Sequence, residues 1–413
     1  MMQLDATSFY PTRAERVELA RRRYFEEGCL PSGVVSDAVF QSWARSQRLH
    51  GDPSGKLAFQ PVSASRTHLS LQRNRFLNDA WREELPRLQV VLASTRCGAI
   101  LTDATGVLLG ATCSGRPHET LMPVAHRVGV TLSEEAVGTT APGIVARTGQ
   151  AAYISGSEHF FEQARLMHCA AAPIHDTSGK LAGILDISSE GSPFSFDAAA
   201  VVDVYARAIE NRLLITQSRE HLVIRMHIDP TLLFSTAVGL IGIDARGEIA
   251  WRNAVASRLL GLPPIDSHLT LPLAEEALGA RVSEVASLPQ SGAAMMRLPS
   301  GLMVWACAAM HAADGRRGLV NVSPAADNLG KAAASGHELP MADPEHASEG
   351  SDLATVKCEE GEILETVSLR DSDRQLIESA LRDSGGNVSK AAKKLNVSRG
   401  LIYRRMREWA AQP

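Results

Sequence analysis

The sequence predicts an α+β protein of several domains that ends in an all-α module, and three observations predict it. The 413 residues exceed the roughly 250–300 at which one hydrophobic core stops growing. Pairs of apolar runs around Asp- and Gly-containing turns alternate with helical patterns between residues 74 and 323. From residue 366 onward the pattern becomes purely helical and rich in Lys and Arg.

Composition places the chain among globular proteins, with 45% hydrophobic and 21% charged residues. The net charge of −4 argues that any affinity for a polyanion is local rather than a property of the whole chain. The six cysteines form no C-x-x-C pair, so we expect neither a zinc site nor a disulfide framework. No run approaches the ~20 apolar residues of a membrane span, so we expect a cytoplasmic protein.

The front half predicts a sheet flanked by helices. After an N-terminal helical segment (1–75), helical patterns run over 74–93 and from 196 to about 225. Between them, GAILTDATGVLLGAT places a tight turn at residues 103–106 between two strands, and CAAAPIHDTSGKLAGILDIS repeats the design around residues 176–179. The residues joining these hairpins predict a helix, a strand around 151–154 and another helix.

These motifs resemble the GAF domain of the acetoin-catabolism-type, sigma-54-dependent activators. That family carries E-x-x-x-GTN-x-I-G-T, then EH-[FY], then C-x-A-A-P-I-x-D-x-x-G-x-L-x-G-x-L-D-[IL]-S; the counterparts here are residues 135–143, 158–160 and 169–188. The segment SWARS at 42–46 is similar to the family's opening helix. The resemblance covers roughly residues 30–215 and implies a GAF-like sensor domain (76–215) for a small molecule. Thr140 replaces the usual asparagine and Pro142 is unexpected, so the family's ligand is not transferred.

Two interpretations stay open for the reactive side chains of this region. His159 either contacts a ligand or is an interior histidine bonded to backbone, and the second is favoured. Cys97, Cys113 and Cys169 either form a redox switch, which needs a low-pKa thiol, or are buried and inert, which is favoured. His159 and Cys169 are the candidate ligand-binding residues.

A metal site is not expected. The pairs His168-Cys169 and His175-Asp176 match no standard ligand spacing, and neighbouring side chains in a strand point to opposite faces. We also expect no cofactor.

Residues 226–323 predict a second α+β domain. LIGIDARGEIAWRNAVASRLLGL indicates strand, Gly turn, strand and helix, and LMVWACAAM and RRGLVNVSP indicate two more strands. The region resembles a PAS-like fold, in which Asn253 occupies an N-x-A position where a strand meets a helix. A plain helix N-cap explains Asn253 equally well. Residues 324–365, rich in Ala, Ser, Gly, Pro and acidic side chains, predict a flexible acidic linker.

The C-terminal stretch GGNVSKAAKKLNVSRGLIYRRMREW predicts two short helices joined by a tight turn at residues 396–397. Asn387 and Ser398 are placed as N-caps. Each helix has one apolar stripe at helical spacing: Val388, Ala391, Ala392 and Leu395 lie at i, i+3, i+4 and i+7, and Ile402, Met406, Trp409 and Ala410 lie at i, i+4, i+7 and i+8. This is helix-turn-helix geometry. A solvated basic helix would explain the charge but not the paired caps and the turn.

The stretch resembles the Fis-type helix-turn-helix, with the pattern GN-x-[ST]-x-A-A-x-x-L-x-[IV]-[SN]-R-x-x-[LI]-Y-R. Arg399 lies in the first turn of the second helix, where two guanidinium donors suit guanine. The lysines of the first helix suit phosphates. The resemblance implies a domain over 366–413 that binds double-stranded DNA as a homodimer. The predicted DNA-binding residues are Asn387, Ser389, Lys390, Lys393, Ser398, Arg399, Tyr403, Arg404 and Arg407.

The two resemblances together predict a sequence-specific transcription regulator, not an enzyme, controlled by a small-molecule effector and possessing no ATPase of its own. The G-x-x-x-x-G-K-[ST] signature is missing, since each Gly-Lys pair (55–56, 179–180 and 330–331) is followed by Leu or Ala. Control would then act at the promoter or by contact with RNA polymerase rather than by remodelling sigma-54 polymerase. Two alternatives remain: an architectural Fis-like protein, or a cysteine-based redox sensor or GAF-fold reductase.

Overall fold

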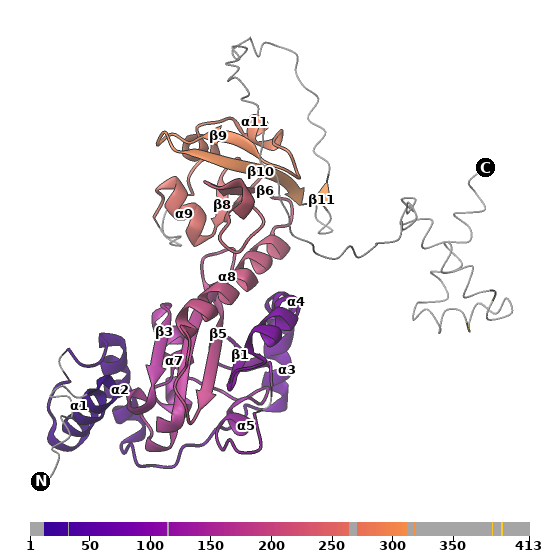
Figure 1. Ribbon diagram of the computed structural model, residues 1–413. Coiled ribbons are helices and arrows are strands. Elements are labelled where there is room, and N and C mark those ends of the chain that lie inside the picture. Colours follow the sequence, from indigo (N-terminus) through magenta and orange to yellow (C-terminus); the bar gives the residue numbers. More distant parts are fainter. Residues whose placement is uncertain are drawn as a thin grey trace, which may run out of the picture. The chain divides into compact units, whose positions relative to one another are not determined.

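The computed structural model describes residues 12–318, apart from 32, 114, 264–270 and 312–316, together with Arg382 and Lys390. The chain divides into two compact units, Met1–Asp327 and Asn328–Pro413. In the first unit, two antiparallel sheets follow one another along the chain (Figure 1). The expected linker and all the expected DNA-binding residues except Lys390 lie outside the described residues.

Four helices precede the first sheet, and local signals explain where they begin and end. The Thr12 side chain accepts a hydrogen bond from Glu15 N and Ser36 accepts one from Val39 N, which satisfies amides that have no partner within the helix. Gly28 ends the first helix in the left-handed region. The four helices are α1 (Arg13–Glu27), α2 (Asp37–His50), α3 (Ala64–Arg73) and α4 (Arg75–Leu92).

Sheet A has the strand order β2-β1-β5-β4-β3. Its strands are β1 (Cys97–Asp103), β2 (Leu108–Ala111), β3 (Ala152–Ser155), β4 (Met167–His175) and β5 (Leu181–Glu190). Both predicted hairpins are present, and Asp103 and Asp176 build their turns in the same way. The Oδ1 atom of each accepts hydrogen bonds from backbone amides two and four residues later, and Gly106 and Gly179 take positive φ.

The segment between the hairpins differs in part from the prediction. It contains α5 (Met122–Ala125), α6 (Glu134–Val137) and α7 (Ala141–Thr148), and then strand β3. The second helix expected there is wrong: two 3-10 turns, η1 (Gly156–Glu158) and η2 (Glu162–Leu166), take its place. Buried His159, Phe160 and Phe161 lie between the turns, and such consecutive apolar burial cannot lie on one face of a single helix.

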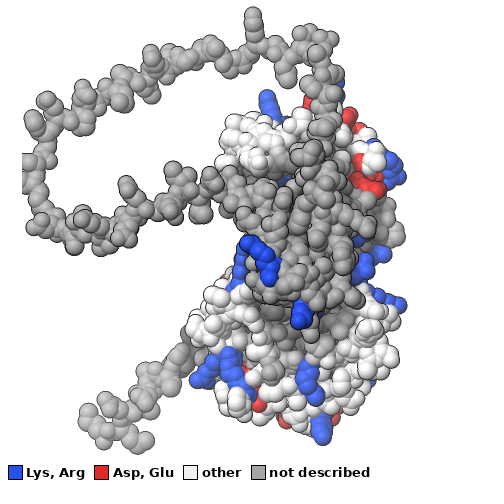
Figure 2. Space-filling model, turned by 90° about the vertical axis from the view of Figure 1, so that its right-hand side faces the viewer, with Lys and Arg blue, Asp and Glu red and all other residues white. Residues whose placement is uncertain are grey.

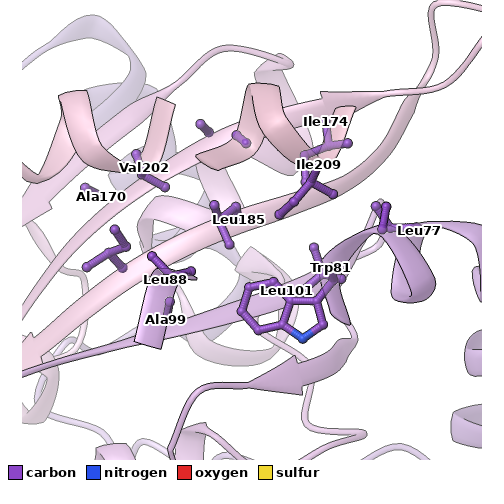
Figure 3. Packing of buried hydrophobic residues seen from close by; sticks show 14 of the residues in the cluster. Leu77, Trp81, Leu88, Ala99, Leu101, Ala170, Ile174, Leu185, Val202 and Ile209 are labelled. Atoms are coloured by element: carbon purple, nitrogen blue, oxygen red, sulfur yellow. The ribbon is translucent and has the colours of Figure 1, made fainter. Parts of the chain in front are cut away.

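One face of sheet A packs against two long helices, α4 and α8 (Ala198–Gln217). Leu77, Trp81 and Leu88 of α4 and Val202 and Ile209 of α8 meet Leu101 and Leu185 from the strands (Figure 3). The opposite face is covered by α2, α7 and the loops between β2 and β4. Sheet A is therefore the middle layer of three.

The predicted extension of the second long helix to about residue 225 is wrong. Helix α8 ends at Gln217, Glu220 takes a positive φ, and residues 222–227 form strand β6. Leu222, Val223 and Ile224 are all buried there. A run with apolar side chains on both faces suits an inner strand better than a surface helix.

Sheet B has the order β11-β10-β6-β7-β8, with β9 paired to β10. Its strands are β6 (Leu222–His227), β7 (Gly239–Ile243), β8 (Ile249–Arg252), β9 (Ala294–Arg297), β10 (Met303–His311) and β11 (Arg317–Gly318). Helices α9 (Ala254–Leu260), α10 (Ala274–Leu278) and α11 (Val282–Ala286), and the 3-10 turn η3 (Pro230–Leu232), accompany it. The N-cap interpretation of Asn253 is confirmed, because its side chain accepts a hydrogen bond from Ala256 N.

Candidate ligand-binding site

A small cavity lies against the face of sheet A opposite α4 and α8. Its volume is about 30 Å³, room for about two water molecules, since one needs roughly 10–15 Å³ by this measure. Strands β1, β4 and β5 supply one wall, and the loops around α6, α7 and η1 supply another. Its lining residues are Leu57, Phe59, Ile100, Ala125, His126, Leu132, Val137, Thr140, Pro142, His159, Ala164, Met167, Cys169, Asp186 and Ser188.

Asp186 brings a buried carboxyl group to this cavity. Along β5, Leu185 and Ile187 enter the core under α4 and α8, so the period-two alternation turns Asp186 and Ser188 to the cavity face. Ser188 Oγ donates to Asp186 Oδ2, whereas Asp186 Oδ1 has no partner among the described residues. Burial raises the pKa of Asp186 to about 7, although the bond from Ser188 opposes the shift.

His159 and Cys169, the two candidate ligand-binding residues, lie together in the cavity wall. His159 Nδ1 is 3.1 Å from Gly156 O and Nε2 is 3.8 Å from Cys169 Sγ. Because a carbonyl only accepts, Nδ1 carries the proton and Nε2 accepts from the thiol. Burial is the main cause that lowers the pKa of His159 to about 4, so the ring is neutral at pH 7. His159 is therefore buried and bonded to backbone through Nδ1, and because it also lines the cavity it stays a candidate for ligand contact.

The environment of the Cys169 thiol shifts its pKa in the opposite direction to the one that a redox-active cysteine requires. Burial, aided by Asp186, raises its pKa well above the usual value for cysteine, and a redox-active cysteine needs the reverse. Cys97 is also buried, with its pKa raised mainly by desolvation. At these two positions the environment favours the inert interpretation over the redox one.

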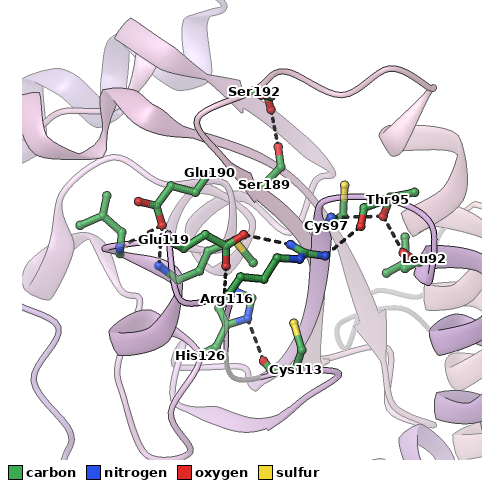
Figure 4. Close-up of polar contacts among 12 residues, drawn as sticks. Leu92, Thr95, Cys97, Cys113, Arg116, Glu119, His126, Ser189, Glu190 and Ser192 are labelled. Carbon is green, nitrogen blue, oxygen red and sulfur yellow. Dashed lines mark hydrogen bonds and ion pairs between the residues drawn. The ribbon is translucent and has the colours of Figure 1, made fainter.

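His126 supplies a second buried polar atom without a partner. Its Nδ1 lies 3.3 Å from Cys113 O, so Nδ1 donates (Figure 4). Its Nε2 has no hydrogen-bond partner among the described residues, although the side chain is buried. Burial lowers the pKa of His126, so Nε2 is an unprotonated acceptor at neutral pH.

The cavity therefore combines apolar walls with two buried polar atoms that have no partner in the described part of the chain, Asp186 Oδ1 and His126 Nε2. Buried polar atoms without a hydrogen-bond partner in the protein are rare, and a bound water or ligand usually satisfies them. His126 accepts, and Asp186 accepts when ionised and donates when protonated. Such a set suits a small hydroxyl-bearing molecule.

Sequence reasoning found His159 and Cys169 but missed Asp186, Ser188 and His126. One feature of the sequence points to Asp186, which is an acidic residue inside the otherwise apolar strand GILDIS. Such a position is informative because charged groups are rarely buried without a role. No feature of the sequence points to His126, because it lies in a loop beyond β2 and only the fold brings it to the cavity.

The two residues that depart from the family pattern have structural roles. Thr140 caps α7 by accepting from Gly143 N, and Pro142 fits the first turn of that helix.

The four residues weighed as metal ligands are separated by the fold. His168 Nδ1 lies 2.7 Å from Ser155 Oγ, His175 pairs with Glu210 at 3.1 Å, and Asp176 is the turn residue described above. Within the described ranges, no three His, Cys, Asp or Glu side chains are grouped as a metal site would require.

For the DNA-binding prediction, the described residues add one observation. Lys390 is helical and exposed, as expected for the first helix of the motif. On the face of the molecule drawn in Figure 2, Lys and Arg side chains form small groups separated by uncharged surface.

None of the described helices combines the length and the apolar character that spanning a bilayer requires.

Two family models match the chain. Residues 10–207 match "MimR, N-terminal domain" and residues 368–409 match "Bacterial regulatory protein, Fis family". The second match lies within the predicted DNA-binding segment.

Curated relatives are transcriptional regulators. The chain is 30% identical over 237 residues to the acetoin catabolism regulatory protein of Cupriavidus necator, covering 56% of the chain and 36% of the relative. It is 29% identical over 202 residues to the acetoin dehydrogenase operon transcriptional activator AcoR of Bacillus subtilis (48% and 33%). It is 28% identical over 180 residues to the propane 2-monooxygenase operon transcriptional activator MimR of Mycolicibacterium smegmatis (43% and 29%). The matches span about a third of the length of these relatives.

Among solved structures, the Escherichia coli DhaR(N)–DhaL complex contains a similar chain, with 17% identity and a TM-score of 0.40. The alignment covers 66% of this chain and 99% of that one.

Proposed function

We propose that this chain, which carries a MimR N-terminal domain and a Fis-type helix-turn-helix, is a transcription regulator whose DNA binding responds to a small molecule in the cavity beside Asp186. One observation carries the proposal: an apolar cavity with two buried polar atoms that lack partners among the described residues, Asp186 Oδ1 and His126 Nε2. The relatives are named as regulators of transcription and not as enzymes. Their names therefore support a role of the cavity in sensing rather than in catalysis.

The cavity favours a small ligand without negative charge. A volume of about 30 Å³ accommodates about two waters, so a metabolite would need part of a wall to move. An anionic ligand would have to shed its hydration beside the Asp186 carboxyl and a neutral His126, neither of which offers it a positive charge. A hydroxyl group can donate to His126 Nε2, and it can donate to or accept from Asp186.

DNA binding is proposed for residues 366–413 of a homodimer. Arg399 would read a guanine, with Ser398, Tyr403 and Arg404 beside it, and Asn387, Ser389, Lys390 and Lys393 would hold phosphates. We further propose that the chain acts without an ATPase of its own, because no Gly-Lys pair in its sequence is followed by Ser or Thr.

A thermal-shift experiment on the full-length protein tests the sensing role. The probes are acetoin, which the names of two of these relatives contain, and dihydroxyacetone, a second small neutral hydroxyketone, with acetate as a charged comparison. We expect at least one neutral probe to raise the unfolding midpoint of the wild type, as a ligand that binds only the native state must. Acetate should not.

Asp186→Leu should abolish the shift, whereas Asp203→Asn, at a half-exposed position on α8 away from the cavity lining, should retain it. An identical shift in Asp186→Leu would place the binding elsewhere. No shift with any probe would remove the support for these ligands. The same probes are then added to operator-binding titrations, where a ligand that changes no DNA affinity would contradict the coupling.

A further inference from the structure

The cavity beside Asp186 is bounded by two kinds of wall. Ile100, Met167, Cys169, Asp186 and Ser188 belong to β1, β4 and β5, which are joined by a continuous antiparallel ladder. The remaining wall comes largely from loops and from the segment that follows α2. A ladder of backbone hydrogen bonds opens only with the sheet, so a ligand must pass through the loop wall.

Arg21 of α1 holds this loop wall from outside. Its guanidinium donates to the carbonyl oxygens of His159 and Phe160, each at 2.5 Å, and reaches Ser157 O at 3.4 Å. The side chain is buried, and desolvation and the neighbouring Arg165 lower its pKa to about 10, so it stays charged at neutral pH. A buried cation bound by carbonyls is costly to leave unpaired, so α1 and the loop are held together.

Helix α2 adds contacts to the same wall. Trp43 is fully buried and its Nε1 donates to Glu158 O at 2.7 Å. Arg45 forms two hydrogen bonds with the Glu134 carboxylate, at 2.6 and 2.8 Å. Ser42 Oγ donates to Thr139 at 2.9 Å. These bonds anchor η1 and the loop around α6, the segments that carry His159 and Val137 to the cavity.

We propose that α1 and α2 form a latch over the cavity, and that Arg21 is its positioning residue. Arg21 is not one of the residues that line the cavity; it acts through the backbone of His159, which does line the cavity and whose ring contacts Cys169. Release of the latch frees the loop wall while the strand wall stays in place. The inference rests on the proposed ligand site, because the latch regulates access to it.

Labelling of Cys169 by iodoacetamide measures the latch without ligand or DNA. Cys169 is buried in the strand wall, so it reacts only when the cavity opens. In the full-length protein, with each cysteine followed by peptide mass, we expect Arg21→Ala to accelerate labelling of Cys169 at least about tenfold, because it removes two charge-assisted bonds to buried carbonyls. Trp43→Phe removes the N–H that bonds to Glu158 O and also the volume of the five-membered ring in a fully buried position, so it should accelerate labelling as well.

Two internal comparisons make the outcome decisive. Arg22→Ala changes an exposed arginine next along α1 and should leave the Cys169 rate unchanged. Cys307 is buried in sheet B and should keep its rate in every variant. An unchanged Cys169 rate in Arg21→Ala would overturn the latch, and so would an equal acceleration at Cys307, because Arg21 would then support the whole fold. A protein that fails to bind effector or DNA can still pass this test, so failure of the latch and of the proposed function are distinguishable.

Discussion

At the scale of single residues, Asp186 is kept at a cost to stability. A carboxyl whose pKa is raised to about 7 by burial binds more protons in the native than in the unfolded state, where its pKa is about 3.9. Stability contributed by this group is therefore greatest below pH 4 and falls as the pH rises to 7. Natural proteins accept such penalties mainly where function requires the group.

Asp186→Asn should remove that dependence, because an amide keeps the bond from Ser188 and does not titrate. We expect the unfolding free energy of the variant, relative to wild type, to rise between pH 4 and pH 8 by up to about 4 kcal/mol. Urea unfolding at several pH values measures the difference. If the unfolding free energies of the two proteins change with pH in parallel, burial does not raise the pKa of Asp186.

The pH dependence must be measured as the difference between the variant and the wild type, because other groups also titrate between pH 4 and pH 8. The pKa values of His159 and His126 are lowered by burial, so their contributions to stability rise with pH up to about 6.5 and oppose that of Asp186. Subtraction of the wild-type curve cancels both. Asp203→Asn, which removes a half-exposed carboxylate on α8 that pairs with Arg207, serves as the control and should give a much smaller change across this pH range.

Residue-scale features of the site were only partly predictable from the sequence. The bonding of His159 to backbone and the inert character of Cys169 follow from residue type and apolar surroundings. The presence of Asp186 and His126 in the lining of one cavity does not, because residues about sixty apart in the sequence come to one cavity only after β5 has paired with β1 and the loop beyond β2 lies over the sheet. Tertiary packing carries that information, and no local pattern contains it.

At the scale of elements, α8 joins the two sheets through a buried amide pair. Asn211 Oδ1 accepts from Asn253 Nδ2 at 2.9 Å, and Asn211 Nδ2 donates to Thr236 O. Asn253 also accepts from Leu240 N and Ala256 N, and its Nδ2 donates a second bond to Val238 O, so all four hydrogen-bonding positions of its side chain are used. Leu214 of α8 belongs to a core cluster with Leu240 of β7 and Trp251 of β8, so α8 packs against both sheets.

Asn211→Ala should weaken this connection while sparing sheet A. It leaves a buried Asn253 N–H unsatisfied, for which we expect a loss of about 1–3 kcal/mol. Hydrogen exchange is the measurement: the amides of Leu240 and Ala256 should exchange faster, and those of β4 and β5 should be unchanged. Equal loss of protection in both sheets would mean that the pair serves general stability and not coupling.

Element prediction succeeded where one local signal decided the structure and failed where packing decided it. The Asp-x-x-Gly turns fix both hairpins of sheet A, because the Asp side chain and a left-handed Gly specify the turn locally. The sequence predicts the end of α8 about eight residues beyond Gln217, where the helix ends in the structure. The run LVIRM suits a helix or a strand by composition, and its pairing with β7 and β10 makes it a strand.

At the scale of the whole molecule, charge is divided unevenly along the chain. Residues 366–413 contain ten Lys and Arg against five Asp and Glu, within a chain of net charge −4. The remainder therefore carries the chain's negative charge and would repel a duplex, so we expect DNA affinity to reside in the C-terminal segment. A sensor joined to such a segment can alter DNA binding by changing how two copies of it are spaced, without forming any new DNA contact.

This division predicts different consequences for two basic residues of the proposed reader. In the full-length protein, Arg399→Ala should cost about 1–3 kcal/mol on the selected operator and relax preference at one base position, because a bidentate contact to guanine is lost. Lys393→Ala should weaken specific and random DNA alike and reduce the slope of log affinity against log salt by about one, because one phosphate contact is lost. Titrations of both variants on operator and random duplexes, at several salt concentrations, separate the two effects. If Arg399→Ala weakens both duplexes equally, Arg399 holds phosphate and some other residue of the second helix reads the base.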